Sequence, residues 1–222
     1  TELIGVDGNS YAPFPSHDDF LAFMELNSGL DGSPELPGTW SSVSEYLRMF
    51  DSKVAVNIAY IIGNAPLRIS TVGWNERPAS DAEVSSMRAM LREGMEDGAF
   101  GLSTGLDYPP GSYADTDELV ALAAETARHG GIYHTHLRNK LGDAFLDPVK
   151  EALEIGRRAE IPCHLTHFYQ KMTHSGSAKL LLELVDGAAQ TQDVTMDCFP
   201  YAYSSTRLLI LIPEWAFDGG PE

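Results

Sequence analysis

GIYHTHLR, residues 131–138, is followed by DPVKEALEIGRRAE (147–160) and then by IPCHLTHF (161–168). The first and third segments are short and β-rich, and the segment between them has the pattern of a helix. A strand, a crossover helix and a second strand in this order predict a parallel β-α-β unit with a right-handed connection. This part of the sequence therefore predicts an α/β protein.

The same alternation extends outward in both directions from this unit. We expect strands at 1–8, 53–63, 99–106, 131–138, 161–168 and 193–201, with helices at 16–27, 41–50, 80–98, 116–131, 147–160 and 177–191. No strand is followed by a glycine-rich dinucleotide fingerprint, which disfavours a Rossmann fold. Six strands without that signal favour a (β/α)8 barrel, which needs eight strands in about 250 residues. We therefore expect an incomplete TIM barrel, with one element missing at each end of the chain.

The composition limits the classes of partner. The 222 residues are 43% hydrophobic and carry a formal charge of −17, from 32 acidic and 15 basic side chains. A field of that sign repels nucleic acid and anionic membrane surfaces, and we find no apolar run long enough to cross a bilayer. Cys163 and Cys198 lie in apolar runs and predict buried free thiols in a reducing, cytoplasmic compartment. Because the sequence begins inside a strand pattern, a targeting segment would lie outside it.

Histidines gather at the ends of two neighbouring strands. On a regular strand His134 and His136 share one face, and Tyr133 and Thr135 share the other. We expect His136 to point into the functional edge of the barrel, with His134 packed one layer below it.

The next strand adds a histidine at the matching place. Alternation places Cys163, Leu165 and His167 on one face, with His164 facing away. His136 and His167 could then bind one zinc ion, with Asp7 from the end of the first strand as a third ligand. The residues alone leave a second interpretation open, in which each histidine is an ordinary hydrogen-bonded residue of the core or rim.

Four motifs carry a resemblance to a known family. They are GAFGLSTGLDYPPGSYADTDELVALA (98–123), GGIYHTHLRN (130–139), PCHLTHFYQK (162–171) and DVTMDCFPYAYSST (193–206). In this order they resemble the N-acyl-D-amino-acid deacylase (D-aminoacylase) family of the amidohydrolase superfamily. NIAYIIGNAPLR (57–68) and GVDGNSYAP (5–13) are also similar to early strands and loops of that family.

The resemblance implies a metal-dependent barrel that hydrolyses an N-acyl amide bond and binds one or two zinc ions. The family's strand-five and strand-six histidines fall on His136 and His167, and its metal-binding cysteine falls on Asp7. The visible strands then correspond to strands two to seven, so that residues 1–222 form the central part of a single catalytic barrel. The family's His-x-His pair on strand one and its catalytic aspartate on strand eight would lie outside this chain.

The resemblance also implies a substrate pocket. Its members are Tyr108, Tyr169, Phe199, Ser205 and Arg138. Two of these positions depart from the family: Tyr169 stands where a lysine is usual, and Phe199 stands where a tyrosine is usual. Because the lost lysine could hold a substrate carboxylate, Arg138 or Arg207 is expected to supply that charge, unless both are structural residues of the rim.

The implied reaction converts an N-acyl-D-amino acid, a small linear amide, into a carboxylate and a D-amino acid. Two alternatives stay open: a cyclic amidohydrolase of the dihydroorotase or hydantoinase kind, and a non-catalytic barrel module. The loop STGLDYPPGSYA (103–114) favours the acyl-amino-acid branch. We disfavour a barrel that handles phosphates, because no glycine-rich phosphate loop precedes a helix.

Overall fold

The computed structural model describes residues 1–139, 145–170, 176–201, 203 and 205–220. Its strands are β1 (Glu2–Ile4), β2 (Ile58–Tyr60), β3 (Ile62–Gly63), β4 (Gly101–Gly105), β5 (Ile132–His136), β6 (Cys163–Leu165) and β7 (Val194–Met196). Its α-helices are α1 (His17–Asp31), α2 (Val43–Arg48), α3 (Asn64–Ile69), α4 (Asp81–Glu96), α5 (Thr116–Ala127), α6 (Asp147–Ala159) and α7 (Ala178–Ala188). Short 3-10 turns are η1 (Gly111–Tyr113), η3 (Leu208–Leu211) and η4 (Glu214–Phe217).

All the strand pairs are parallel and follow the order of the chain. β1 pairs with β2, and a five-stranded sheet has the order β3-β4-β5-β6-β7. β2 and β3 are separated by Ile61 alone, and the Phe100 amide donates to the Tyr60 carbonyl just before β4 begins. The six expected strand positions are therefore present as one curved, chain-ordered wall, which confirms the predicted α/β barrel-type fold.

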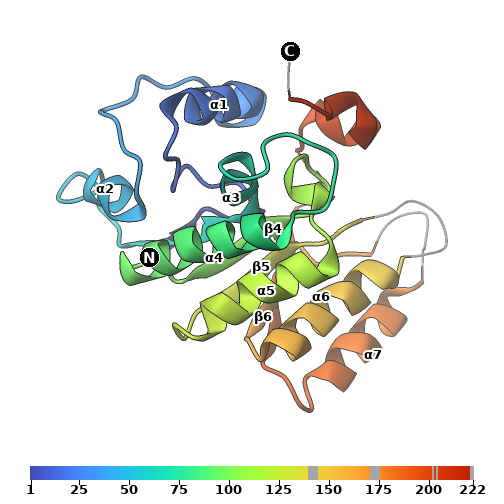
Figure 1. Cartoon of the computed structure of the whole chain (residues 1–222). Coiled ribbons are helices and arrows are strands. Elements are labelled where there is room, and N and C mark those ends of the chain that lie inside the picture. Colours follow the sequence, from blue (N-terminus) through green and yellow to red (C-terminus); the bar gives the residue numbers. More distant parts are fainter. Residues whose placement is uncertain (140–144, 171–175, 202, 204, 221–222) are drawn as a thin grey trace.

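Helices α4, α5, α6 and α7 follow one another across one face of this wall (Figure 1). The core between them and the sheet includes many side chains with no more than 1% exposure. Among them are Met87 and Leu91 of α4, Leu119 and Leu122 of α5, Ile155 of α6, and Leu102, Tyr133, Cys163 and Leu165 of the strands. Burial of these apolar side chains is the main free energy that holds the wall in place.

The opposite face of the wall carries Ser103, His134 and His136. Register pairs Ser103 with His134 and Gly105 with His136, and Tyr133 points into the helix-covered core. The prediction that His134 and His136 share one face is therefore confirmed.

The alternation predicted for the next strand was correct for Cys163, His164 and Leu165, but the two faces were assigned the wrong way round and His167 does not continue the pattern. His164 is the register partner of His134, and their rings stack with centroids 5.0 Å apart and an interplanar angle of 22°. His164 therefore shares the face of His134, while Cys163 and Leu165 lie in the core. β6 ends at Leu165, and His167 has a left-handed backbone with φ 37°, so strand alternation does not extend to it.

Serine side chains cap the starts of two helices. Ser16 accepts from the Asp19 amide, and Ser80 forms a capping box with Glu83. Helix α3 was not among the predicted helices. Its Pro66 lies in the first turn, where the missing N–H costs no hydrogen bond.

The two cysteines have different surroundings. Both thiols are free, but only Cys163 is buried; Cys198 is exposed, so the prediction of two buried thiols was half wrong. Within the described ranges, the helices are all too short or too polar to span a bilayer.

A small aromatic cluster packs α1 against the main body. Phe14, Phe20 and Phe23 are buried there, and Trp40 packs against Phe20.

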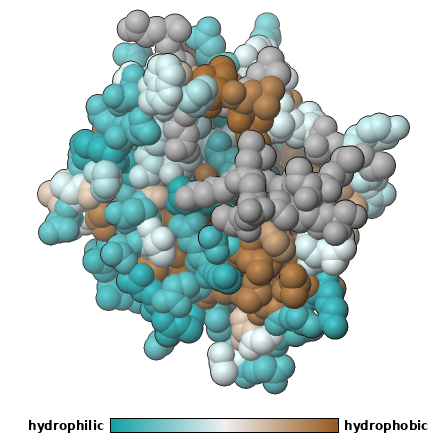
Figure 2. All heavy atoms as spheres, turned by 90° about the vertical axis from the view of Figure 1, so that its right-hand side faces the viewer, coloured by the Kyte–Doolittle hydropathy of each residue, from teal (hydrophilic) through white to brown (hydrophobic). Residues whose placement is uncertain are grey.

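Figure 2 shows the face on the right of Figure 1, with apolar side chains gathered in separate places. Exposed large apolar residues of the C-terminal half include Leu180 and Leu182 of α7 and, further on, Leu211 and Trp215.

Candidate metal centre

Asp7 lies in a tight loop that follows β1. It has a left-handed backbone with φ 56°, between two glycines of positive φ, Gly5 and Gly8. A Cβ atom at Gly105 would lie 2.0 Å from the Asp7 carbonyl oxygen, so the loop can sit against the end of β4 only because residue 105 is a glycine. The carboxylate of Asp7 is thereby fixed at the carboxyl edge of the sheet.

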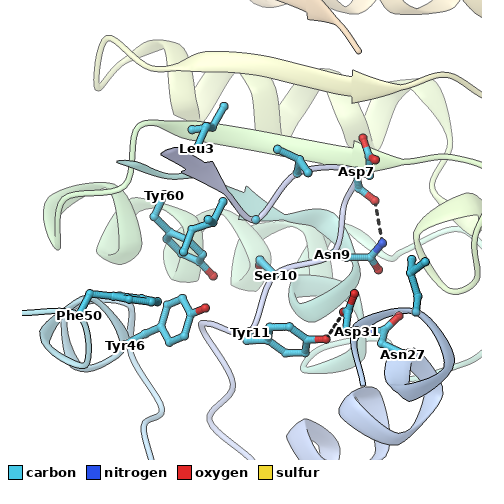
Figure 3. A pocket seen from close by; sticks show the side chains of 14 residues that line it. Leu3, Asp7, Asn9, Ser10, Tyr11, Asn27, Asp31, Tyr46, Phe50 and Tyr60 are labelled. Carbon is cyan, nitrogen blue, oxygen red and sulfur yellow. Dashed lines mark hydrogen bonds between the residues drawn. The ribbon is translucent and has the colours of Figure 1, made fainter. Parts of the chain in front are cut away.

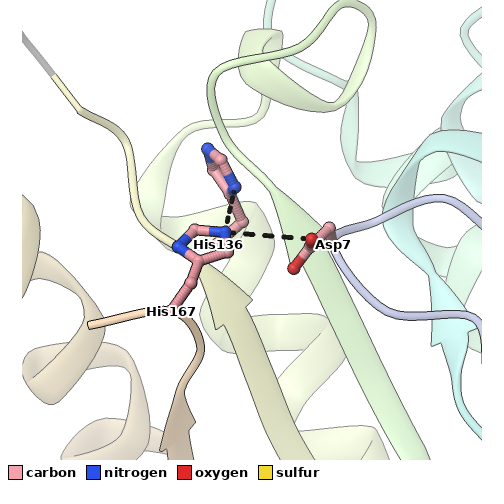
Figure 4. A group of neighbouring side chains, drawn as sticks. All are labelled: Asp7, His136 and His167. Atoms are coloured by element: carbon pink, nitrogen blue, oxygen red, sulfur yellow. Dashed lines mark hydrogen bonds and ion pairs between the residues drawn. The ribbon is translucent and has the colours of Figure 1, made fainter. Parts of the chain in front are cut away.

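Two imidazoles meet the Asp7 carboxylate at this edge (Figure 4). His136 is the last residue of β5 and is 7% exposed. Its Nδ1 atom lies 2.7 Å from Nε2 of His167, which in turn lies 3.8 Å from Oδ2 of Asp7. One donor atom from each of the three residues lies within 4.8 Å of the other two. The structure therefore brings together the three residues that the sequence suggested as metal ligands.

The turn that carries His167 is held by an aspartate of the next strand unit. The backbone N–H of His167 donates at 2.5 Å to Oδ1 of Asp197, a residue that directly follows β7. This hydrogen bond stabilises the left-handed backbone of His167 and so sets the direction of its ring.

Asp107 was not identified as a site residue from the sequence. Its Oδ2 atom lies 3.0 Å from Nε2 of His136, and its Oδ1 atom accepts from the Asn139 backbone N–H at 2.7 Å. Because the carboxylate occupies Nε2, the His136 ring presents Nδ1 to His167 and Asp7. The available signal was the DYPPG loop (107–111), which follows a strand end where functional residues gather.

The donor set fits a zinc ion. Oδ1 of Asp7 is buried and has no hydrogen-bond partner among the described residues. Burial raises the pKa of the Asp7 carboxyl, which the neighbouring His136 and His167 oppose, and burial together with His136 lowers the pKa of His167. Two imidazoles and one carboxylate are a ligand set that zinc accepts, and a cation at this position would complete the coordination of the orphaned oxygen.

A cavity of about 270 Å³ opens beside this centre. Four of the five residues expected to contact substrate line it, namely Tyr108, Tyr169, Phe199 and Ser205. The Phe199 ring stacks on His167 with centroids 5.4 Å apart, and Tyr108 packs against His136 at 5.0 Å.

Arg138 is the exception and does not line the cavity. Its guanidinium donates to the Glu151 carboxylate and to the carbonyls of Ser112 and Ala114. These bonds tie α6 to the loop that follows Tyr108. The structure thus places Arg138 in a supporting position, away from the space where a substrate would lie.

Arg207 takes the position by the cavity. It is 7% exposed, and its guanidinium carbon lies 4.2 Å from the centroid of the Tyr108 ring. Its terminal nitrogens donate to Asn27 and, at 3.4 Å, to Asn9. Of the two arginines considered from the sequence, Arg207 is the one next to the candidate metal centre.

Comparisons with known proteins find deacylases of N-acyl-D-amino acids. The chain is 38% identical to an N-acyl-D-aspartate deacylase from Alcaligenes xylosoxydans xylosoxydans, in an alignment that spans 94% of this chain. It is 35% identical to an N-acyl-D-glutamate deacylase of the same organism, in an alignment that spans 96% of this chain. Over almost its whole length the chain is similar to members of the N-acyl-D-amino-acid deacylase (D-aminoacylase) family. No family model matches the sequence.

Solved deacylase structures share the fold. The N-acyl-D-glutamate deacylase from Bordetella bronchiseptica, solved with zinc and a phosphonate mimic of the tetrahedral intermediate, superposes with a TM-score of 0.78 and 30% identity over 90% of this chain. A D-aminoacylase described as having a binuclear metal centre gives a TM-score of 0.76 at 28% identity. The chain covers 41% of each of these structures, and 41% and 42% of the two deacylase sequences.

The sequence resemblance makes several positions of the site informative. Asp7 lies where the resemblance implies a metal-binding cysteine, and its carboxylate lies with the two histidines. Tyr169 and Phe199 lie where it implies a lysine and a tyrosine, and both line the cavity. Arg207, from a later segment, carries a positive charge and lines the same cavity.

A second cavity, of about 450 Å³, lies on the other side of the Asp7 loop (Figure 3). Tyr46, Phe50 and Tyr60 line it, and the Tyr11 hydroxyl donates to Asp31 at its edge. It shares Asp7, Asn9 and Leu30 with the cavity beside the metal centre. This hollow therefore lies directly behind the loop that carries the carboxylate ligand.

Proposed function

We propose that residues 1–222 form the central part of the catalytic barrel of a metal-dependent deacylase that hydrolyses an N-acyl-D-amino acid to a carboxylate and a D-amino acid. The observation that carries the proposal is the convergence of Asp7, His136 and His167 beside a 270 Å³ cavity. The family relatives named for deacylation of D-amino acids support the substrate class. The cytoplasmic setting stays a prediction from the sequence.

Asp7, His136 and His167 are the residues that would hold the ion. Zinc bound there supplies Lewis-acid polarisation of an amide carbonyl and activation of water. Asp107 keeps the His136 ring in the orientation that exposes Nδ1. The Asp197 bond to the His167 backbone does the same for the second imidazole. The general base is expected outside this chain.

Arg207 is proposed to bind the α-carboxylate of the substrate. Its guanidinium is held in place by Asn27 and by the Tyr108 ring, and it faces the same cavity as the metal ligands. A buried, pre-positioned guanidinium recognises a carboxylate with paired hydrogen bonds. The hydroxyls of Tyr108 and Ser205 lie on the same cavity wall.

The residues that line the cavity beside the metal centre favour a D-amino acid with an uncharged side chain. Leu30, Tyr169, Phe199 and Ile210 give the described wall an apolar and aromatic character, and Asp7 and Asp107 add negative charge. Within the part of the chain that is described, Arg207 is the only arginine or lysine that lines this cavity. One guanidinium can neutralise one carboxylate, so a second, side-chain carboxylate would be repelled.

The test is an assay of the intact zinc-loaded protein with matched substrates. We expect hydrolysis of N-acetyl-D-leucine and N-acetyl-D-phenylalanine, slower turnover of N-acetyl-D-aspartate, and none of N-acetyl-L-leucine. Turnover of dihydroorotate or hydantoin instead would indicate the cyclic amidohydrolase alternative. No turnover of any of these amides by the zinc-loaded protein would favour a non-catalytic module.

A further inference from the structure

A second group of metal-type ligands lies one layer below the candidate centre. His134, His164 and Asp197 each offer a donor atom, and these atoms lie within 4.8 Å of one another. The group shares no residue with Asp7, His136 and His167. It joins three successive strand units, because His134 lies on β5, His164 on β6 and Asp197 directly after β7.

The environment of His134 is hard to explain as ordinary core packing. The residue is 3% exposed, and its Nδ1 atom has no hydrogen-bond partner among the described residues. A buried imidazole nitrogen without a partner has lost its hydrogen bond to water and gained none in return.

His164 and Asp197 supply the other donors. Nε2 of His164 lies 2.9 Å from Oδ2 of Asp197, and its Nδ1 atom lies 2.8 Å from the Thr195 hydroxyl. The stacked rings of His134 and His164 lie side by side on adjacent strands. In a tetrahedral zinc site the donor atoms lie about 3.3 Å apart. The donor atoms of His134, His164 and Asp197 already lie within 4.8 Å of one another, so small side-chain rotations bring them to that spacing.

From these contacts we propose that His134, His164 and Asp197 form a second, independent binding site for a zinc-like divalent cation. Two imidazoles and one carboxylate select a borderline-soft d-block ion over magnesium or calcium, which prefer oxygen ligands. Because Oδ1 of Asp197 also accepts from the His167 backbone, an ion here would stiffen the turn that carries His167. The proposal does not depend on the deacylase reaction.

The direct test is X-ray diffraction at the zinc absorption edge from crystals of the intact protein equilibrated with zinc. We expect an anomalous peak between His134, His164 and Asp197, within about 2 Å of each donor atom, in addition to a peak at Asp7, His136 and His167. A map with a peak at Asp7, His136 and His167 (the upper centre) and none between His134, His164 and Asp197 (the lower group) would overturn the proposal.

Zinc stoichiometry gives an independent readout in solution. His164→Val should hold one zinc equivalent fewer than His129→Ala, a control that removes an exposed histidine at the end of α5. His136→Ala should lose the upper ion and keep the lower one, which separates failure of this proposal from failure of the deacylase assignment. Equal zinc content in folded His164→Val and His129→Ala would contradict the second site.

Discussion

Nε2 of His136 lies 3.0 Å from Oδ2 of Asp107, and this contact leaves Nδ1 facing His167. A carboxylate behind a histidine ligand fixes the tautomer and the ring orientation before any ion arrives. The loop after β4 therefore contributes to the centre without supplying a ligand.

Removal of that carboxylate should weaken zinc binding. We expect Asp107→Asn to raise the zinc dissociation constant by roughly 10–100-fold, the range found for partners that orient a ligand. Competition with a chromogenic chelator measures the change. Asp117→Asn on α5, where the side chain is 81% exposed, is the matched control, and equal affinities for the two variants would contradict the role of Asp107.

Asp7 can be tested without disturbing its loop. Asparagine tolerates the left-handed backbone at φ 56°, so Asp7→Asn should fold normally while it loses zinc affinity by at least about tenfold, because a neutral amide is a poor zinc ligand. Asp7→Cys restores an anionic ligand and should bind zinc more tightly than Asp7→Asn. Retention of full zinc affinity in Asp7→Asn would exclude the carboxylate as a ligand.

The close approach of β4 to the Asp7 loop makes a further prediction. In Gly105→Ala the added Cβ would lie 2.0 Å from the Asp7 carbonyl oxygen, so the loop must move. We expect reduced zinc occupancy by elemental analysis, together with a lower melting temperature. Gly187→Ala in α7 meets no atom within 4 Å and should leave both unchanged. Wild-type zinc content in Gly105→Ala would show that the loop position is not important for binding.

The two arginines should respond differently to the same substitution. Arg207→Met should raise KM for an N-acetyl-D-amino acid by at least about tenfold, equivalent to about 1.4 kcal/mol of binding free energy, with a smaller change in kcat. Arg138→Met should leave KM nearer to that of the wild type and lower the free energy of unfolding by about 2 kcal/mol, because Glu151 and two carbonyls lose a charged donor. Steady-state kinetics and urea denaturation separate the two effects, and a reversed pattern would exchange the two roles.

The sequence predicted the fold because the order of strands and helices depends on local periodicity, whereas of the three candidate ligands only His136 lies on a strand where alternation places it. β5 is a regular five-residue strand, so alternation correctly placed His134 and His136 on one face. The same counting failed for β6, which is only three residues long and ends before His167. Alternation carried beyond the end of a strand assigned His164 to the wrong face, and the lower group of ligands was therefore not predicted.

Contacts between distant segments were the other limit of sequence reasoning. Asp107 reaches His136 across 29 residues, and Arg207 reaches Asn27 across 180. Nothing in the local pattern around Arg138 and Arg207 distinguishes an arginine that ties two loops together from one that lines a cavity. Only the packed structure shows which side chain lies where.

The central claim is that the ion held by Asp7, His136 and His167 is required for hydrolysis of an N-acyl-D-amino acid. The most direct measurement is the turnover of N-acetyl-D-leucine by the intact protein, assayed as isolated, after removal of metal with a chelator, and after addition of zinc. We predict that activity falls to background when metal is removed and returns with zinc, and that His136→Ala shows no such recovery. Undiminished turnover by the metal-free protein would contradict the account.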